Sequence, residues 1–323
     1  MTIDATTPRF EFRRAASVGE AVQWLATPGA RVHAGGTDLV PNLRRGLERP
    51  SIVVDIGGIA GLAGIAWRDD ACAIGATVTL ARLAADARVA STYPALAEAA
   101  AAVGAPAHRS AGTVGGNLCA DTRCVHYNQG AWWRGAVGGC LKRGGDVCHV
   151  APQGRRCHAA FCGDLAPALI ALSAELDVAS YGGVRRMAAV DLYRDDGAAH
   201  LALLPGELVT AVRLPPPDGV SGYRKARVRG SIDFPLAGVA IALRVGQRSI
   251  ERAIVAVTGV GPRPVVVGTE AIVGRRVDDE TAALLATRVE QSVKPMRTTA
   301  TPAAYRRQVA GVLAARLLRT LAA

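Results

Sequence analysis

Residues 34–39 of this chain read AGGTDL, two glycines followed by a hydroxyl and a carboxylate. The segment before them, residues 31–34, has the pattern of a short strand that stops at the glycine pair. Glycines let several backbone N–H groups converge on one anion because no Cβ obstructs them, and Thr37 adds a hydroxyl donor. The stretch therefore predicts a cradle for a diphosphate or, as the simpler alternative, an ordinary tight turn.

A second stretch of the same kind, SAGTVGGNL, occupies residues 110–118. Three glycines again surround hydroxyl side chains, and Asn117 can both donate and accept hydrogen bonds. Neither stretch is G-x-G-x-x-G, so a nicotinamide-type Rossmann site is not indicated. Two such loops in one chain favour a single dinucleotide that contacts both of them, and two independent turns are the alternative.

The composition is that of a folded protein with more than one domain. The chain has 323 residues, of which 50 % are hydrophobic and 20 % are charged, so a packed core is possible and wholesale disorder is excluded. The net charge is +11, but 35 of the 38 basic residues are arginines spread along the chain. This distribution favours a charged surface over nucleic-acid binding. Without a long apolar run or a signal-like N-terminus, we expect no membrane span and a cytoplasmic location.

The order of expected elements predicts an α+β protein with two domains. Residues 51–56 resemble a buried strand, residues 164–175 an apolar helix, and residues 176–181 another strand. Leu214 is followed by three prolines, which form a rigid connector. We therefore place the domains at residues 1–215 and 216–323, with antiparallel strands over residues 223–268 and helices over the last 45 residues or so.

Six of the seven cysteines lie between Cys119 and Cys162. A reducing compartment disfavours disulfides, so this density indicates a metal site. A structural zinc site favours close C-x2-C pairs, which are absent here, although His149 and His158 directly follow cysteines. A 4Fe–4S cluster tolerates wider loops, and the net charge of +4 over residues 119–162 suits an anionic cluster. Tyr127, Trp132 and Trp133 are expected to shield the cluster or simply to pack the segment.

Together the two glycine stretches resemble the FAD-binding subunits of the xanthine oxidase family of molybdenum hydroxylases. The resemblance covers about residues 8–320, including the motif YRKAR at residues 223–227. It implies a two-part FAD-binding domain of the PCMH or vanillyl-alcohol-oxidase type, followed by an α+β C-terminal domain with an antiparallel sheet. It places Asp164 and Leu165 near the flavin ring, with Lys225 as a weaker assignment. The other residues implied to bind FAD are Val32, His33, Ala34, Gly35, Gly36, Thr37, Asp38, Thr113, Val114, Gly115, Gly116 and Asn117.

The segment over about residues 119–162 is an insert relative to ordinary members of that family. Its motifs TRCV, CLKRGGD and RCHAAF resemble the β (medium) subunits of 4-hydroxybenzoyl-CoA reductases, although His126 stands where tyrosine is expected. The resemblance implies that a 4Fe–4S cluster is ligated by Cys124, Cys140, Cys148 and Cys157. The other three cysteines are expected to be buried thiols, and ligand sets that include Cys119 or Cys162 stay open.

No catalytic residue is expected in this chain, because it has no visible Ser/His/Asp or paired-carboxylate constellation. The resemblance implies an electron-transfer subunit in a dimer of heterotrimers, with molybdopterin in an α subunit and two 2Fe–2S clusters in a γ subunit. Reduced ferredoxin would supply electrons for dehydroxylation of 4-hydroxybenzoyl-CoA to benzoyl-CoA. The alternatives are the flavin subunit of another molybdenum hydroxylase, acting on CO, an aldehyde or an N-heterocycle, and a non-enzymatic scaffold or zinc module.

Overall fold

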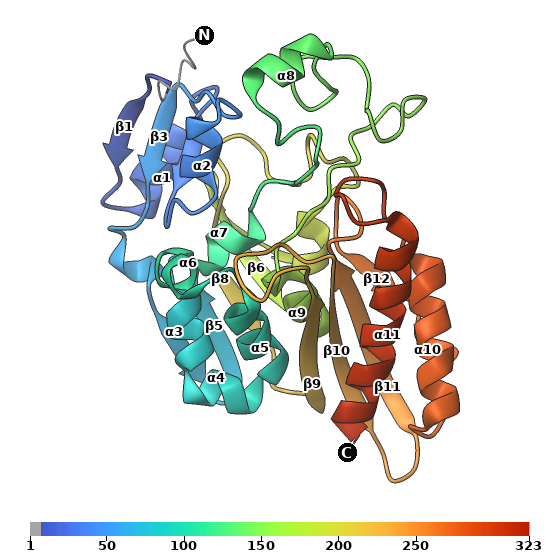
Figure 1. The fold of residues 1–323 in the computed structure, drawn as a ribbon. Coiled ribbons are helices and arrows are strands. Elements are labelled where there is room, and N and C mark those ends of the chain that lie inside the picture. The colour runs from blue at the N-terminus through green and yellow to red at the C-terminus, as the bar shows by residue number, and fades with distance from the viewer. Residues whose placement is uncertain (1–7, 323) are drawn as a thin grey trace.

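The computed structural model describes residues 8–322 as three β-sheets with helices packed around them (Figure 1). The first sheet is parallel, in the order β1–β3–β2. Ser17 begins the helix that packs on this sheet, because its Oγ accepts a hydrogen bond from the Glu20 N–H at 3.2 Å. The elements of this part are β1 (Glu11–Arg14), α1 (Val18–Leu25), β2 (Arg31–His33), α2 (Leu39–Arg44) and β3 (Ile52–Asp55).

The second sheet has five antiparallel strands in the order β4–β5–β8–β6–β7. Its strands come from two distant parts of the chain, and the helices between them pack against it. The strands are β4 (Ile65–Arg68), β5 (Ala71–Gly75), β6 (Glu175–Ser180), β7 (Gly183–Ala188) and β8 (Leu208–Leu214). The helices are α3 (Leu80–Ala85), α4 (Ala87–Thr92), α5 (Pro94–Ala102), α6 (Pro106–Ala111), α7 (Val114–Leu118) and α9 (Leu165–Ala171), with short 3-10 turns η1 (Ala60–Leu62) and η2 (Ala189–Leu192).

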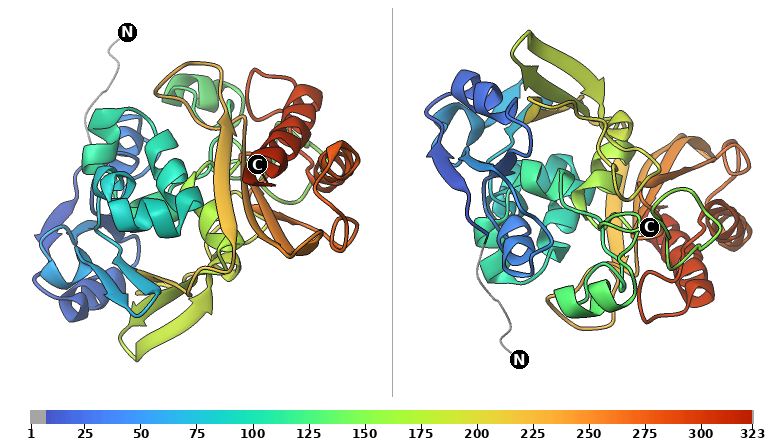
Figure 2. Two further views of the ribbon diagram at one scale, coloured as in Figure 1. Left: turned by 90° about the horizontal axis from the view of Figure 1, so that it is seen from below. Right: turned by 90° about the horizontal axis from the view of Figure 1, so that it is seen from above.

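The third sheet is antiparallel, in the order β12–β11–β10–β9. Two long helices cover its outer face (Figures 1 and 2), and α9 and α5 approach it from the other side. The expectation of antiparallel strands followed by helices in this part is confirmed. The elements are β9 (Val220–Ala226), β10 (Ala237–Val245), β11 (Ile250–Thr258), β12 (Val265–Val267), α10 (Asp279–Ser292) and α11 (Ala303–Ala322).

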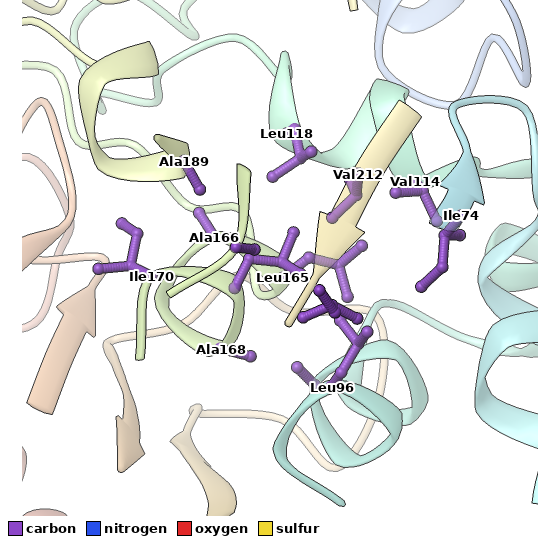
Figure 3. Packing of buried hydrophobic residues seen from close by; sticks show 14 of the residues in the cluster. Ile74, Leu96, Val114, Leu118, Leu165, Ala166, Ala168, Ile170, Ala189 and Val212 are labelled. Carbon is purple, nitrogen blue, oxygen red and sulfur yellow. The ribbon is translucent and has the colours of Figure 1, made fainter. Parts of the chain in front are cut away.

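The main hydrophobic core joins the second glycine stretch to the sheets (Figure 3). Val114 and Leu118 of α7 pack with Ile74 of β5, Val212 of β8 and Leu165 of α9, and all five are buried. Because α7 and α9 share this core, the residues before each helix are held at fixed positions. The core therefore positions the residues that the sequence assigns to the flavin.

The cysteine-rich insert lies between α7 and α9 and forms its own lobe, at the top of Figure 1. Within residues 119–162 the structure has one helix, α8 (Ala131–Ala136), and otherwise loops and bridges. The backbones of Arg123 and Ala160 pair with each other and so close the base of the insert. Loops therefore make up most of the insert. Among residues 8–322, no helix is long and apolar enough to span a bilayer.

Candidate flavin cradle and cysteine pocket

The first glycine stretch forms the turn between β2 and α2 and leaves no room for side chains. A Cβ on Gly35 would lie 1.8 Å from the carbonyl oxygen of Ala111, which belongs to the second stretch. Gly36 has φ +68°, and a Cβ there would lie 2.7 Å from His33 Nε2. The structure thus brings the two predicted loops into direct backbone contact, and this contact requires glycine.

The second glycine stretch is hydrogen-bonded to the segment that follows β5. The Val114 and Gly115 N–H groups donate to the carbonyls of Val78 and Ala76 at 2.9 and 2.8 Å. Thr113 caps α7, since its Oγ1 accepts from the Gly116 N–H at 3.2 Å. These bonds hold the loop in shape without any help from a ligand.

The two stretches differ in which backbone groups they leave open. Within residues 8–322, the N–H groups of Gly35, Gly36 and Thr37 donate to no protein acceptor, whereas the N–H groups of Val114 and Gly115 are already used. The first turn also remains partly accessible to water. Open N–H groups on a glycine turn match the donor pattern that a diphosphate needs, so the residues present fit the phosphate end of FAD.

Asp164, Leu165 and Lys225 come together at the junction between the two domains. Asn117 links them to the second glycine stretch, because its Oδ1 accepts from the Leu165 N–H at 3.0 Å. Lys225 Nζ lies 3.0 Å from Asp164 Oδ2, and both side chains are only 4 % exposed. The Tyr223 hydroxyl donates to Asp164 Oδ1 at 2.5 Å. Burial raises the pKa of Asp164, while Lys225 and Tyr223 act in the opposite direction.

Sequence reasoning missed the role of Tyr223. It stands two positions before Lys225 on β9, so both side chains lie on the same face of the strand. This alternation along the strand could have indicated from the sequence that Tyr223 lies beside Lys225.

Four cysteines far apart in the insert line one small cavity, which we call the cysteine pocket. They are Cys124, Cys140, Cys148 and Cys157. Each is at most 9 % exposed, and none forms a disulfide. The remaining lining residues are His126, Tyr127, Leu141, Lys142, His149 and Ala159.

The three other cysteines do not line the pocket. Cys72 is buried at β5, as expected of a structural thiol, whereas Cys119 and Cys162 are half-buried. Burial raises the pKa of Cys72 to about 11 and that of Cys119 to about 12. Their place outside the pocket, and not this shift, separates them from the four cysteines that line it.

Backbone donors and a cation face the sulfurs of the pocket. The Ala159 N–H donates to Cys157 Sγ at 3.4 Å. Burial raises the pKa of Cys157 to about 11, while the Ala159 N–H and the Lys142 ammonium lower it. Burial likewise raises the pKa of Cys124, and the backbone N–H groups of His126 and Tyr127 oppose that shift. These donors would stabilise negative sulfur.

The placement of the sulfurs bears on which metal could be held. Among residues 8–322, no three His, Cys, Asp or Glu side chains are close enough to bind a single metal ion. Zinc would need four ligands about 2.0–2.3 Å from one point. A 4Fe–4S cube is larger, so its four thiolates stand further apart. Four buried cysteines are the donor set of a 4Fe–4S cluster, and the same donor set also occurs in structural zinc sites.

The two candidate sites are tied together by Asp38. Its carboxylate pairs with the Arg123 guanidinium, and its Oδ2 accepts from the Asp121 N–H at 2.8 Å. Arg123 is 8 % exposed and also donates to Asn42 Oδ1 of α2 at 3.0 Å. The Asp38 side chain thus points toward Asp121 and Arg123 of the insert, and the sequence did not suggest these contacts.

The aromatic residues of the insert do not act alike. Tyr127 is 2 % exposed and lines the cysteine pocket, as expected of a shield. Trp133 packs beside His126, with ring centroids 5.9 Å apart. Trp132 is 71 % exposed on α8, so the expectation that it shields a cluster or packs the insert is wrong. Neighbouring positions on a helix point in different directions, and α8 buries only one side.

Comparison with known proteins finds two family models that match successive parts of the chain. Residues 8–217 match the family described as the FAD binding domain in molybdopterin dehydrogenase, and residues 221–321 match the CO dehydrogenase flavoprotein C-terminal domain. The aldehyde oxidoreductase FAD-binding subunit PaoB of Escherichia coli is 36 % identical over 67 % of this chain and 71 % of its own length. The carbon monoxide dehydrogenase medium chain of Afipia carboxidovorans is 27 % identical over 94 % of this chain and 93 % of its own.

Solved structures show the same fold over nearly the whole chain. The Cu,Mo-CO dehydrogenase in its cyanide-inactivated form superposes with a TM-score of 0.78 at 26 % identity, covering 98 % of this chain and 99 % of that one. Quinoline 2-oxidoreductase from Pseudomonas putida 86 gives 0.78 at 26 % identity, with 98 % of both chains covered. The chain therefore belongs to the FAD-binding medium subunits of the xanthine oxidase family of molybdenum hydroxylases.

Proposed function

We propose that this chain is an electron-transfer subunit that holds FAD at the two glycine stretches and a 4Fe–4S cluster in the cysteine pocket. The observation that carries the proposal is the convergence of four cysteines, up to 33 positions apart in the chain, on one buried cavity. FAD binding follows from membership of the family. The proposed cluster goes beyond what the relatives' names state.

The residues of the chain would bind, orient and exclude water, and bond-breaking is proposed for a molybdenum-binding partner. Gly35, Gly36 and Thr37 would donate N–H groups to the diphosphate, while Asp164 and Lys225 would lie near the flavin ring. Tyr127 and Ala159 pack against Cys124 and Cys157 in a small apolar cluster that keeps water from the pocket. Flavins exchange one or two electrons and iron–sulfur clusters exchange one, so the pair can join carriers of both kinds.

Two activities compete for the whole complex. The relatives' names favour a dehydrogenase, since they include enzymes for an aldehyde, CO and 6-hydroxypseudooxynicotine. The motifs of the insert support the narrower reading of a ferredoxin-linked 4-hydroxybenzoyl-CoA reductase, with molybdopterin and 2Fe–2S partner subunits in a dimer of heterotrimers. The purified complex should be assayed with aldehydes, CO and N-heterocycles and an artificial acceptor. The reductase hypothesis is tested by assaying the same complex for reduction of 4-hydroxybenzoyl-CoA by a reduced electron donor.

The charge of the insert is relevant to the proposed ferredoxin. Of its six basic residues, three are buried or paired inside the protein: Arg123, Arg134 and Lys142. Their position suits a wrapping for an anionic cluster more than a docking surface. Arg143 is half-buried and donates to the Gly46 carbonyl at 3.1 Å, whereas Arg155 and Arg156 are exposed and Arg156 pairs with Asp195. An acidic donor docking at these two exposed arginines would bind less tightly as salt rises. Ferredoxin-linked reduction that is insensitive to ionic strength would contradict electrostatic docking.

The cluster is tested by iron and flavin analysis of anaerobically purified protein, with EPR after dithionite reduction. We expect about four irons per chain, as one cubane cluster requires, together with FAD. Cys148→Ser should lose most of the iron and keep the flavin. Cys72→Ser is the matched control, because Cys72 is equally buried but lies outside the pocket, and it should keep both. Zinc, or no metal, in material with intact flavin would refute the cluster.

A further inference from the structure

Among the described residues 8–322, Lys142 is the one lysine, arginine, aspartate or glutamate side chain that lines the cysteine pocket. Its side chain is 7 % exposed, so water screens its charge poorly. The ammonium also lies over the Tyr127 ring, 4.5 Å from the centroid. A lysine is seldom buried unless it is paired, so its burial at this position calls for a reason.

The ammonium is held in place by polar partners outside the pocket. Lys142 Nζ lies 2.5 Å from Asp121 Oδ1 and 3.2 Å from the Thr122 carbonyl, and it also contacts Thr122 Oγ1. The Asp121 N–H in turn donates to Asp38 of the first glycine turn. Lys142 therefore has a fixed position in a chain of contacts that leads from the cysteine pocket to the candidate flavin cradle.

We propose that Lys142 sets the reduction potential of the group held by the four cysteines, with Asp121 as its opposing charge. This inference rests on the proposed 4Fe–4S site. One-electron reduction of a cluster bound by the four cysteines would add one negative charge beside Lys142. A fixed positive charge nearby stabilises the reduced form and raises the potential, whereas a fixed negative charge lowers it.

The size of the effect follows from Coulomb's law. A unit charge roughly 10 Å away at an effective dielectric constant of about 20 changes a one-electron equilibrium by about tenfold or more. A tenfold change corresponds to ~59 mV for one electron. Asp121 offsets part of the Lys142 charge, so removing either member of the pair should move the potential, and the two shifts should have opposite signs.

The test is a redox titration of the cluster, followed by EPR, in the full chain with its flavin. Lys142→Met removes the charge at similar length and should lower the reduced-to-oxidised ratio at a fixed potential by about tenfold. Asp121→Asn keeps an acceptor oxygen for Lys142 and should raise that ratio. Arg155→Met is the matched control, because it removes an exposed cation from the same insert, and it should change the ratio less than twofold.

Opposite shifts of the two variants distinguish a charge effect from loss of structure, which would move both in one direction or neither. The proposal is overturned if both variants shift the reduced-to-oxidised ratio in the same direction. It is also overturned if the ratio in Lys142→Met stays within twofold of that in the parent protein. If Lys142→Met assembles no cluster, Lys142→Arg must match the parent and Asp121→Asn must still raise the ratio; any other result overturns it. Absence of iron from the parent protein would instead refute the cluster itself.

Discussion

The flavin cradle and the cysteine pocket are built in different ways. The cradle is made by backbone against backbone, at Gly35 and Ala111, and it is continuous with the main core through Val114 and Leu118. The pocket lobe has only a small core of its own, in which two of the candidate ligands, Cys124 and Cys157, are themselves core residues. The cradle therefore keeps its shape without a ligand, whereas the pocket depends on polar ties and on whatever its cysteines bind.

The sharpest way to break this comparison is to place a methyl group where the two glycine stretches touch. Gly35→Ala puts a Cβ 1.8 Å from the Ala111 oxygen, and overpacking against backbone costs about 3 kcal/mol. If the strain falls on the cradle, FAD affinity should drop about 100-fold, as measured by quenching of flavin fluorescence. Gly61→Ala is the control, because nothing lies within 4 Å of its Cβ. Unchanged affinity in Gly35→Ala would show that the loops are not a rigid unit.

The second test removes the polar ties on which the insert depends. Arg306 of α11 is 1 % exposed and donates to the carbonyls of Leu236 and Met296 at 3.1 and 2.9 Å and to Thr298 Oγ1 at 3.2 Å. The Thr298 carbonyl accepts the N–H of Val125, beside Cys124, at 2.7 Å. Arg306 thereby fixes the segment that receives one end of the insert.

Arg306→Met should lower the free energy of unfolding by about 3 kcal/mol, because several buried acceptors lose their donor. Thermal or denaturant unfolding measures this loss. Arg307→Met changes an exposed neighbour on the same helix, and we expect a change within about 0.5 kcal/mol. If both variants lose the same free energy of unfolding, the hydrogen bonds of the buried Arg306 guanidinium do not stabilise the fold.

The same contrast explains what the sequence could predict. Short motifs point to both glycine stretches, whereas the choice of four cysteines comes from the family resemblance, because spacing alone leaves Cys119 and Cys162 open as ligands. The contacts of Asp38 with Arg123 and of Asp164 with Tyr223 were not predicted, because they join side chains that are distant in the chain and depend on the packed fold. Local patterns give no register for such pairs.

The predicted end of the helix over residues 164–175 is wrong, and the reason is local. The apolar pattern over residues 164–175 predicts one helix, but α9 ends at Ala171. Ser173 takes the left-handed conformation, with φ +55°, and Glu175 already begins β6. Apolar residues serve a buried helix and a buried strand equally well, so hydrophobicity alone does not locate the change from one to the other.

A smaller effect is expected from pH, at the base of the insert. His200 is 8 % exposed, and its Nε2 lies 3.0 Å from the Ala120 carbonyl. Burial, with Lys142 as a further cause, lowers its pKa to about 4 from 6.5. The unfolded chain therefore binds more protons than the folded one between these values, so stability falls as pH drops through that window.

This one histidine should account for a loss of about 2 kcal/mol between pH 7 and pH 5. His200→Gln keeps a donor for the Ala120 carbonyl but does not titrate. Between pH 7 and pH 5 its unfolding free energy should therefore fall by about 2 kcal/mol less than that of the parent protein. Denaturant unfolding at both pH values gives the comparison, and the slopes above pH 7 should coincide. Parallel curves at all pH values would assign the acid sensitivity to other groups.

The smallest expected effect compares two adjacent tryptophans on α8. Trp132 is 71 % exposed, so Trp132→Ala should change the unfolding free energy by no more than about 0.5 kcal/mol. Trp133 packs beside His126, which lines the pocket, and its truncation should cost about 1 kcal/mol. Denaturant unfolding of the two variants beside the parent protein measures both losses. Equal losses would contradict the view that only the Trp133 side of α8 packs on the pocket. The lobe would then be stabilised chiefly by its cysteines and by its contacts with the rest of the chain.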